Sequence, residues 1–164
     1  MSVQLGQEVK CVVTGLTGTV TQRIEKFNGS IQFAVQPKNE DGRTVLEATV
    51  LDHQYLEVIG DGLKDKVIEH VETDIKLGQE LKDKVSDFRG IAMEKAIFIN
   101  GCVYFWVVPK SQPNDDGKAP VGTYLSVERL EVVGDGLLKS AAKPSVKSPG
   151  GPSRSVKAAS AIKG

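Results

Sequence analysis

The sequence contains two similar halves, and this duplication limits the fold more than any other feature. Residues 5–38 align without a gap to residues 77–110, at a spacing of 72 positions. The matched segments include turns as well as strand-like stretches: Asn28-Gly29 and Asn100-Gly101, 33–38 and 105–110, and 56–63 and 130–137. Solenoid repeats are shorter, roughly 20–50 residues, and occur in longer arrays. Each copy is therefore predicted to be a small domain.

Within the first copy, short apolar segments alternate with turn residues, which is typical of a small β domain. The expected strands are 8–14, 19–27, 31–36, 45–51 and 56–59. Asn28-Gly29 predicts a type I′ hairpin, because both central residues of that turn adopt positive φ. Pro37 should end the third strand because it cannot donate a ladder hydrogen bond. Asp52 is expected to cap one helical turn over 52–55.

This pattern predicts an all-β fold of two tandem SH3-like or KOW-like small barrels. The expected boundaries are 1–63 for the first barrel, 64–76 for a linker, 77–137 for the second barrel and 138–164 for a basic C-terminal arm. A domain of this size buries only ~60% of its unfolded surface and is marginally stable alone. Packing between the barrels or against a partner would add to its stability. Each copy could alternatively be half of one larger sandwich. Apolar linker residues at spacings of three and four favour a short amphipathic helix, with an extended linker as the alternative.

Charge is separated along the chain. The 164 residues include 21 basic and 21 acidic side chains, and every acidic residue lies at or before Asp135. The 15 basic residues before the arm leave that part of the chain at −6, and the arm carries +6. The arm's basic residues are Lys139, Lys143, Lys147, Arg154, Lys157 and Lys163. They predict an arm that docks on an acidic protein surface or on nucleic acid, with a solvated tail as the alternative.

Few residues in the chain suggest catalysis. Two cysteines and two histidines cannot supply a typical metal cage, and Cys11 and Cys102 align with Asp83 and Ser30 rather than with each other. Free thiols and a reducing compartment are therefore expected. No acid–base or nucleophilic constellation recurs in both copies, so we predict no enzyme activity, cofactor or metal. No apolar run approaches the ~20 residues of a membrane helix, and the N-terminus shows no secretion signal.

The second copy carries the more aromatic third strand. Successive side chains of a strand point to opposite faces, so Tyr104 and Trp106 share one face if Phe105 enters the core. An outward Trp–Tyr pair near Lys110 could stack on bases or anchor a protein interface. The acidic body favours the protein interface. Tyr104, Trp106, Lys110 and the six basic residues of the arm are the candidate interface residues.

The string 77–92, followed by 99–103, resembles a family of small proteins encoded by tailed bacteriophages. Members open with a Leu-Gly-Asp-Lys-Val-like segment, followed by Thr-Gly-Phe-x-Gly-Ile and then Asn-Gly-Cys. The second copy is the closer match, whereas Leu16 and Ser30 replace the Phe and Cys in the first. The resemblance covers roughly 5–62 and 77–136 and supplies no catalytic residues.

The resemblance implies a virion structural protein: a capsid decoration, neck or tail-attachment component made in the bacterial cytoplasm. Its expected partners are other virion proteins, namely capsid, neck or tail subunits, in an assembly with several copies of the chain. Membranes are not expected as partners, and nucleic acid is expected only through the arm. The alternative is a free phage-encoded protein that binds nucleic acid or a host defence component.

Overall fold

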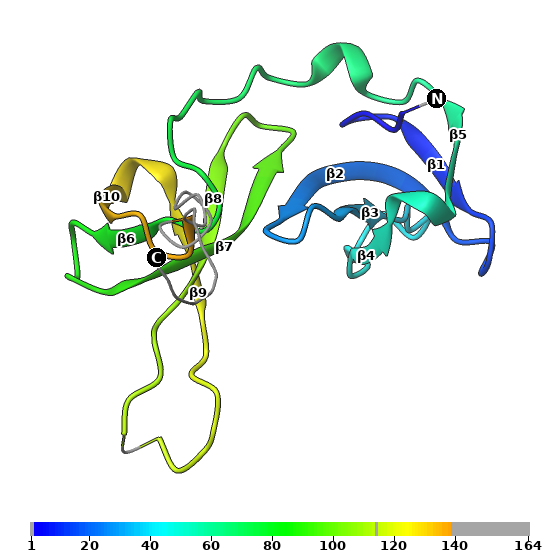
Figure 1. Cartoon of the computed structure of the whole chain (residues 1–164). Helices are drawn as coiled ribbons and strands as arrows, with labels where there is room; N and C mark the ends of the chain where they lie inside the picture. The colour runs from blue at the N-terminus through cyan, green and yellow to red at the C-terminus, as the bar shows by residue number, and fades with distance from the viewer. Residues whose placement is uncertain (1, 114, 139–164) are drawn as a thin grey trace, which may run out of the picture.

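A computed structural model describes residues 2–113 and 115–138 of the chain. In that part, ten antiparallel strands are linked by hydrogen bonds into one sheet, and the only helices are three single turns of 3₁₀ helix. The sheet path runs β10-β6-β7-β2-β1-β5. Outside this path, β3 pairs with β2 and β4, and β8 pairs with β7 and β9 (Figure 1). The prediction of an all-β fold is confirmed.

The first copy forms a five-stranded unit with strand order β5-β1-β2-β3-β4. Its strands are β1 (Glu8–Cys11), β2 (Thr17–Lys26), β3 (Ile31–Gln36), β4 (Thr49–Asp52) and β5 (Leu56–Gly60). A 3₁₀ turn, η1 (His53–Tyr55), precedes the last strand, and the Asp52 side chain accepts a hydrogen bond from the Gln54 amide at 2.9 Å. The predicted cap is therefore present, and β4 begins four residues later than expected.

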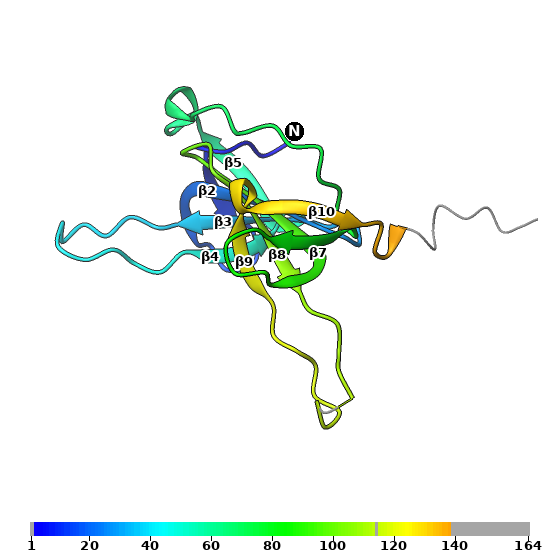
Figure 2. The ribbon, with the colours of Figure 1, turned by 90° about the vertical axis from the view of Figure 1, so that its left-hand side faces the viewer.

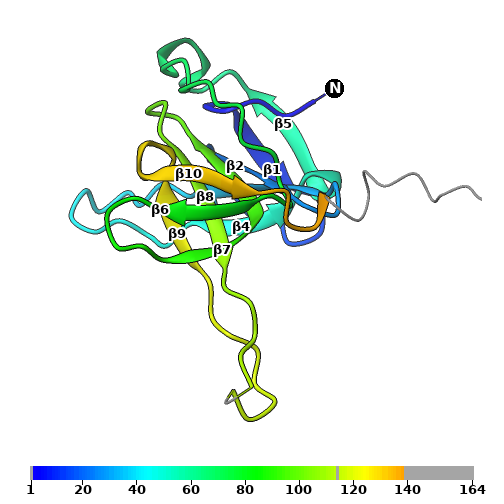
Figure 3. The ribbon, with the colours of Figure 1, turned by 60° about the vertical axis from the view of Figure 1, so that its left-hand side comes forward.

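The second copy repeats this arrangement, with strand order β10-β6-β7-β8-β9. Its strands are β6 (Glu80–Asp83), β7 (Arg89–Phe98), β8 (Val103–Val108), β9 (Thr123–Ser126) and β10 (Leu130–Gly134), with η3 (Val127–Arg129) before the last strand. In both copies, the connection after the third strand projects from the body as a long loop, over 37–48 in the first copy and over 109–113 and 115–122 in the second (Figures 2 and 3).

The Asn-Gly hairpins form, but the predicted type I′ turn is wrong. Gly29 has φ +91°, whereas Asn28 is not among the described residues with positive φ. The Gly29 amide donates to the Lys26 carbonyl at 2.9 Å, as in a type I turn followed by a left-handed glycine. The Asn28 side chain instead accepts from the Ser30 amide at 3.0 Å, so it stabilises the turn through its carbonyl oxygen.

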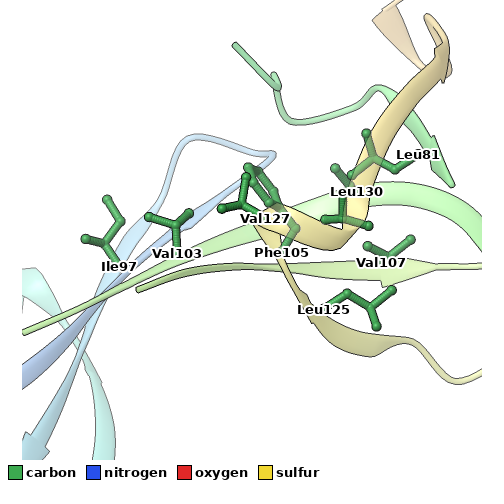
Figure 4. Close-up of a cluster of buried hydrophobic side chains, with 9 residues drawn as sticks. Leu81, Ile97, Val103, Phe105, Val107, Leu125, Val127 and Leu130 are labelled. Carbon is green, nitrogen blue, oxygen red and sulfur yellow. The ribbon is translucent and has the colours of Figure 1, made fainter. Parts of the chain in front are cut away.

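Each copy has its own hydrophobic core, centred on equivalent phenylalanines of the third strand. Phe33 is packed with Val3, Val9, Val20 and Val35. Phe105 is packed in a larger cluster, most of which Figure 4 labels: Leu81, Ala92, Ile97, Val103, Val107, Leu125, Val127 and Leu130. Leu5 contacts both clusters. The two copies therefore have separate core clusters that share one leucine.

An approximate two-fold axis relates the copies where β2 pairs with β7. Ile24 lies opposite Ala96, its own equivalent 72 positions later, and both are buried. The Phe27 amide donates to the Met93 carbonyl at 2.9 Å, and the equivalent Ile99 amide donates to the Thr21 carbonyl at 3.1 Å. Residues i and j thus exchange roles across the axis, as in an isologous dimer contact. The chain joins two similar units much as a symmetric dimer would, through continuous antiparallel pairing.

The linker is not the amphipathic helix that its spacing favoured. One 3₁₀ turn, η2 (Lys64–Lys66), begins it, and residues 67–76 contain no helix or strand. The Ile68 amide donates to the Ile99 carbonyl at 2.9 Å, and the Val71 amide donates to the Gly101 carbonyl at 3.1 Å. These amides donate to hairpin carbonyls of the second copy, so residues 64–76 run as an irregular segment across the molecule (Figure 1). We call this segment the strap.

Candidate protein-binding face

Alternation along β8 divides its side chains between the core and the opposite surface. Val103, Phe105 and Val107 are buried, whereas Tyr104 and Trp106 are partly exposed. The structure therefore confirms that Phe105 enters the core and that Tyr104 and Trp106 share the other face.

Two edge-to-face aromatic pairs cover this outer surface of the second unit. Trp106 lies opposite Tyr124 of β9, with ring centroids 4.8 Å apart and planes at 61°. Tyr104 meets Phe98 of β7 at 5.5 Å and 65°. A Cβ atom on Gly122 would lie 2.8 Å from the Trp106 indole, so the glycine makes room for that ring. We call Phe98, Tyr104, Trp106 and Tyr124 the aromatic face.

Glu94 holds one ring of the aromatic face, that of Tyr124, in place. It lies opposite Trp106 in the β7–β8 register, accepts a hydrogen bond from the Tyr124 hydroxyl at 3.0 Å, and pairs with Lys26 at 3.2 Å. Burial, and then the hydrogen bond to Glu94, raise the pKa of Tyr124 to about 12. The phenol is therefore a fixed neutral donor at ordinary pH, and Lys26 of the first copy contributes to the same network.

The aromatic face is present in the second copy only. Gln32 and Ala34 of β3 occupy the positions of Tyr104 and Trp106, and Val50 of β4 occupies that of Tyr124. The two copies share their cores and turns but differ on this surface, so the aromatic side chains are not required by the fold itself.

The structure brings together some of the predicted interface residues and separates others. Tyr104 and Trp106 lie two positions apart on one strand face. Lys110 is exposed beyond the end of β8, where its ammonium group is 3.7 Å from Glu80 of β6. The six basic residues of the arm, from Lys139 to Lys163, lie outside the described residues.

Three members of this network were not predicted from the sequence. Phe98, Tyr124 and Glu94 come from strands that only the pairing register places beside β8. Tyr124 was the most accessible to sequence reasoning, because it aligns with Val50 in the predicted fourth strand.

A buried carboxylate is the other polar feature that distinguishes the second copy. The Asp83 side chain is fully buried, and Arg129 donates to its two oxygens at 3.0 and 2.6 Å. The Ser86 hydroxyl also donates to it, at 2.5 Å. Hydrogen bonding to Arg129, and then to Ser86, holds the pKa of Asp83 well below its usual range. The group ties the β6–β7 turn to η3, which is a structural role.

Other polar groups form no reactive cluster. The free-thiol prediction is confirmed, since Cys11 is buried and Cys102 exposed without a disulfide. Within residues 2–113 and 115–138, no three His, Cys, Asp or Glu side chains are grouped as metal ligands. No helix in that part of the chain is long and apolar enough to cross a membrane. No protein family model, curated protein or solved structure matches the chain.

Proposed function

We propose that this chain is a non-enzymatic structural protein of a bacteriophage particle that docks on other virion proteins. The aromatic face is the observation that carries the docking proposal. Its four side chains project from a supported sheet surface, and Tyr124 remains 41% exposed. Tyrosine and tryptophan are enriched among the anchor residues of protein interfaces. The surrounding body has a net charge of −6, which disfavours binding to a polyphosphate backbone.

We further propose that each unit is an SH3-like barrel, with the domains 1–63 and 77–137 separated by the strap at 64–76. The strand order β5-β1-β2-β3-β4, with a 3₁₀ turn before the last strand, supports this assignment in the first copy. The second copy repeats both features.

The phage origin and the virion setting are supported by the sequence resemblance of 77–92 and 99–103 to small phage-encoded proteins. A capsid decoration, neck or tail-attachment position would place several copies on a repeated protein surface. The basic arm at 138–164 would reach a neighbouring acidic surface in that assembly.

Mass spectrometry of gradient-purified particles tests this proposal. We expect the chain to be present at a copy number fixed relative to the major capsid protein. Its absence from particles would overturn the virion role and favour a free binding protein.

A matched pair of variants tests the docking surface. Replacing Tyr104 and Trp106 together with alanine should sharply reduce incorporation into particles. Tyr55→Ala, at an exposed position of the first copy, should leave incorporation unchanged. Equal incorporation of both variants, with unfolding transitions like the unsubstituted chain, would overturn the assignment of the face.

A further inference from the structure

We propose that a cleft at the junction of the two copies binds a ligand that combines an anionic group, carboxylate or phosphate, with an apolar portion. The cleft has a volume of about 560 Å³, within the ~300–1,000 Å³ range of small-molecule sites. It is lined by β2, β7, the N-terminal residues 2–5 and the strap. Both copies therefore contribute, and neither could form it alone.

The floor of the cleft presents cations on opposite sides of the two-fold axis. Arg23 of β2 and Lys95 of β7 are equivalent residues, and each lines the cleft. Lys64 and His70 line it from the strap, and the carboxylates of Glu25 and Asp65 are its acidic groups. Counted without His70, three cations face two carboxylates. A cationic excess is notable here because the chain before the arm is acidic overall, at −6.

The contacts among these groups leave two lysines available. Arg23 donates to Glu25 at 2.8 Å and lies over the Phe33 ring, 5.9 Å from its centroid. One Glu25 oxygen is therefore occupied, and Glu25 lies opposite Lys95 in the β2–β7 register. Across the described residues, neither Lys64 nor Lys95 has a carboxylate within 4.0 Å. Charge-assisted hydrogen bonds from two ammonium groups would suit a carboxylate or phosphate oxygen.

Apolar side chains form the remaining wall. Val3 and Ile97 are almost buried, at 7% and 5% exposed, so the partly exposed Leu5 and Val67 give this wall most of its accessible apolar area. An alkyl or aromatic group could bury area against them, whereas a bare inorganic anion would leave them unused. The lining thus selects for a ligand with both an apolar body and an anionic head.

Several contacts hold the cleft open as built. Leu5 contacts both cores, and the Leu63 amide donates to the Gly6 carbonyl at 2.7 Å. The strap is held further along by its hydrogen bonds to the second hairpin, from Ile68 and Val71. Because these contacts tie the walls to both cores and to the second hairpin, binding requires little ordering of the chain.

Isothermal titration calorimetry of the full chain tests the proposal with four probes, each below its critical micelle concentration. Octanoate and octyl phosphate carry both features, octanol lacks the charge, and acetate lacks the apolar body. We expect one or both of the first two to bind, and octanol and acetate to bind at least about tenfold more weakly. The stronger of the two anionic probes identifies the head group. Octanol binding as well as octanoate, or no binding by either anionic probe, would overturn the proposal.

Variants localise the binding. Lys64→Gln with Lys95→Gln should weaken the anionic probe by about tenfold or more, with little change in melting temperature because both side chains reach solvent. Lys10→Gln with Lys84→Gln, two exposed lysines that do not line the cleft, provides the matched control. Equal weakening by both pairs would show general charge attraction and overturn the site. In methyl NMR spectra, shifts confined to Val3, Val67 and Ile97 would support it independently of any variant.

Discussion

At position 83, the second copy buries a carboxylate where the first has Cys11, and this single residue makes the second unit sensitive to acid. Asp83→Asn should lower the melting temperature by several degrees at neutral pH, because Arg129 would lose the charge that it faces. The lowered pKa of Asp83 means that its contribution is present above the unfolded value, 3.8. That contribution is lost as pH falls through the lower folded value. In thermal melts from neutral to acid pH, the two proteins should therefore begin to converge only as pH falls below about 4, and should meet only below the lower folded pKa.

Asp87→Asn is the control for this prediction. Asp87 pairs with Lys82 at 3.2 Å, but its side chain is 81% exposed. Asparagine also tolerates its positive φ of 66°. The control should melt close to the unsubstituted protein. An Asp83→Asn variant with the same melting curve as that control would contradict a stabilising role for the buried pair.

Tyr124 carries the corresponding prediction at alkaline pH. One of the three tyrosines should ionise with a pKa of about 12 in an ultraviolet titration. Glu94→Gln should lower that pKa without restoring the ordinary value of 10.0, because burial is the larger cause. A folded pKa above the unfolded value stabilises the protein below pH 10, and this contribution is lost as pH rises through 12. Three tyrosines that all ionise near 10 would show that Tyr124 is not held as described.

Among the elements, β2 and β7 depend on glycine for close approach to their neighbours. A Cβ atom on Gly90 would lie 2.6 Å from the Val108 carbonyl oxygen, and one on Gly18 would lie 2.5 Å from that of Gln36. Because backbone cannot yield as a side chain can, Gly18→Ala and Gly90→Ala should each lower the free energy of unfolding by about 1–3 kcal/mol. Denaturant titration measures this change. Gly134→Ala is the control, since the nearest neighbour of its added Cβ atom would be a Glu80 side-chain oxygen at 3.3 Å. An equal loss of unfolding free energy in this control and in the other two variants would contradict the prediction.

Local sequence signals predicted the elements more completely than their assembly. The Asn-Gly pairs, Pro37 and the Asp52 cap act within a few residues. The succession of strands and turns along each copy could therefore be predicted from them. The β2–β7 pairing joins residues about 70 positions apart, and no turn signal encodes it. The helix prediction for the strap was wrong for a similar reason. The carbonyls that accept hydrogen bonds from the Ile68 and Val71 amides belong to a distant hairpin. The alternation of β8 predicted half of the aromatic face, and the pairing of β7 and β9 supplied the rest.

On the scale of the whole molecule, the β2–β7 junction should hold the two units together without the strap. A protease site inserted after Thr73, in the strap, allows the chain to be cut between the copies. We expect the fragments to elute together in size-exclusion chromatography and to separate only in denaturant, because five residue pairs join β2 to β7 and Leu5 contacts both cores.

Ile24→Asp with Ala96→Asp places like charges face to face at the axis, where both positions are at most 4% exposed. That variant should separate after cutting yet remain one body while uncut, since the strap keeps the local concentration high. Separation of the cut chain without those substitutions would show that the strap, rather than strand pairing, joins the copies.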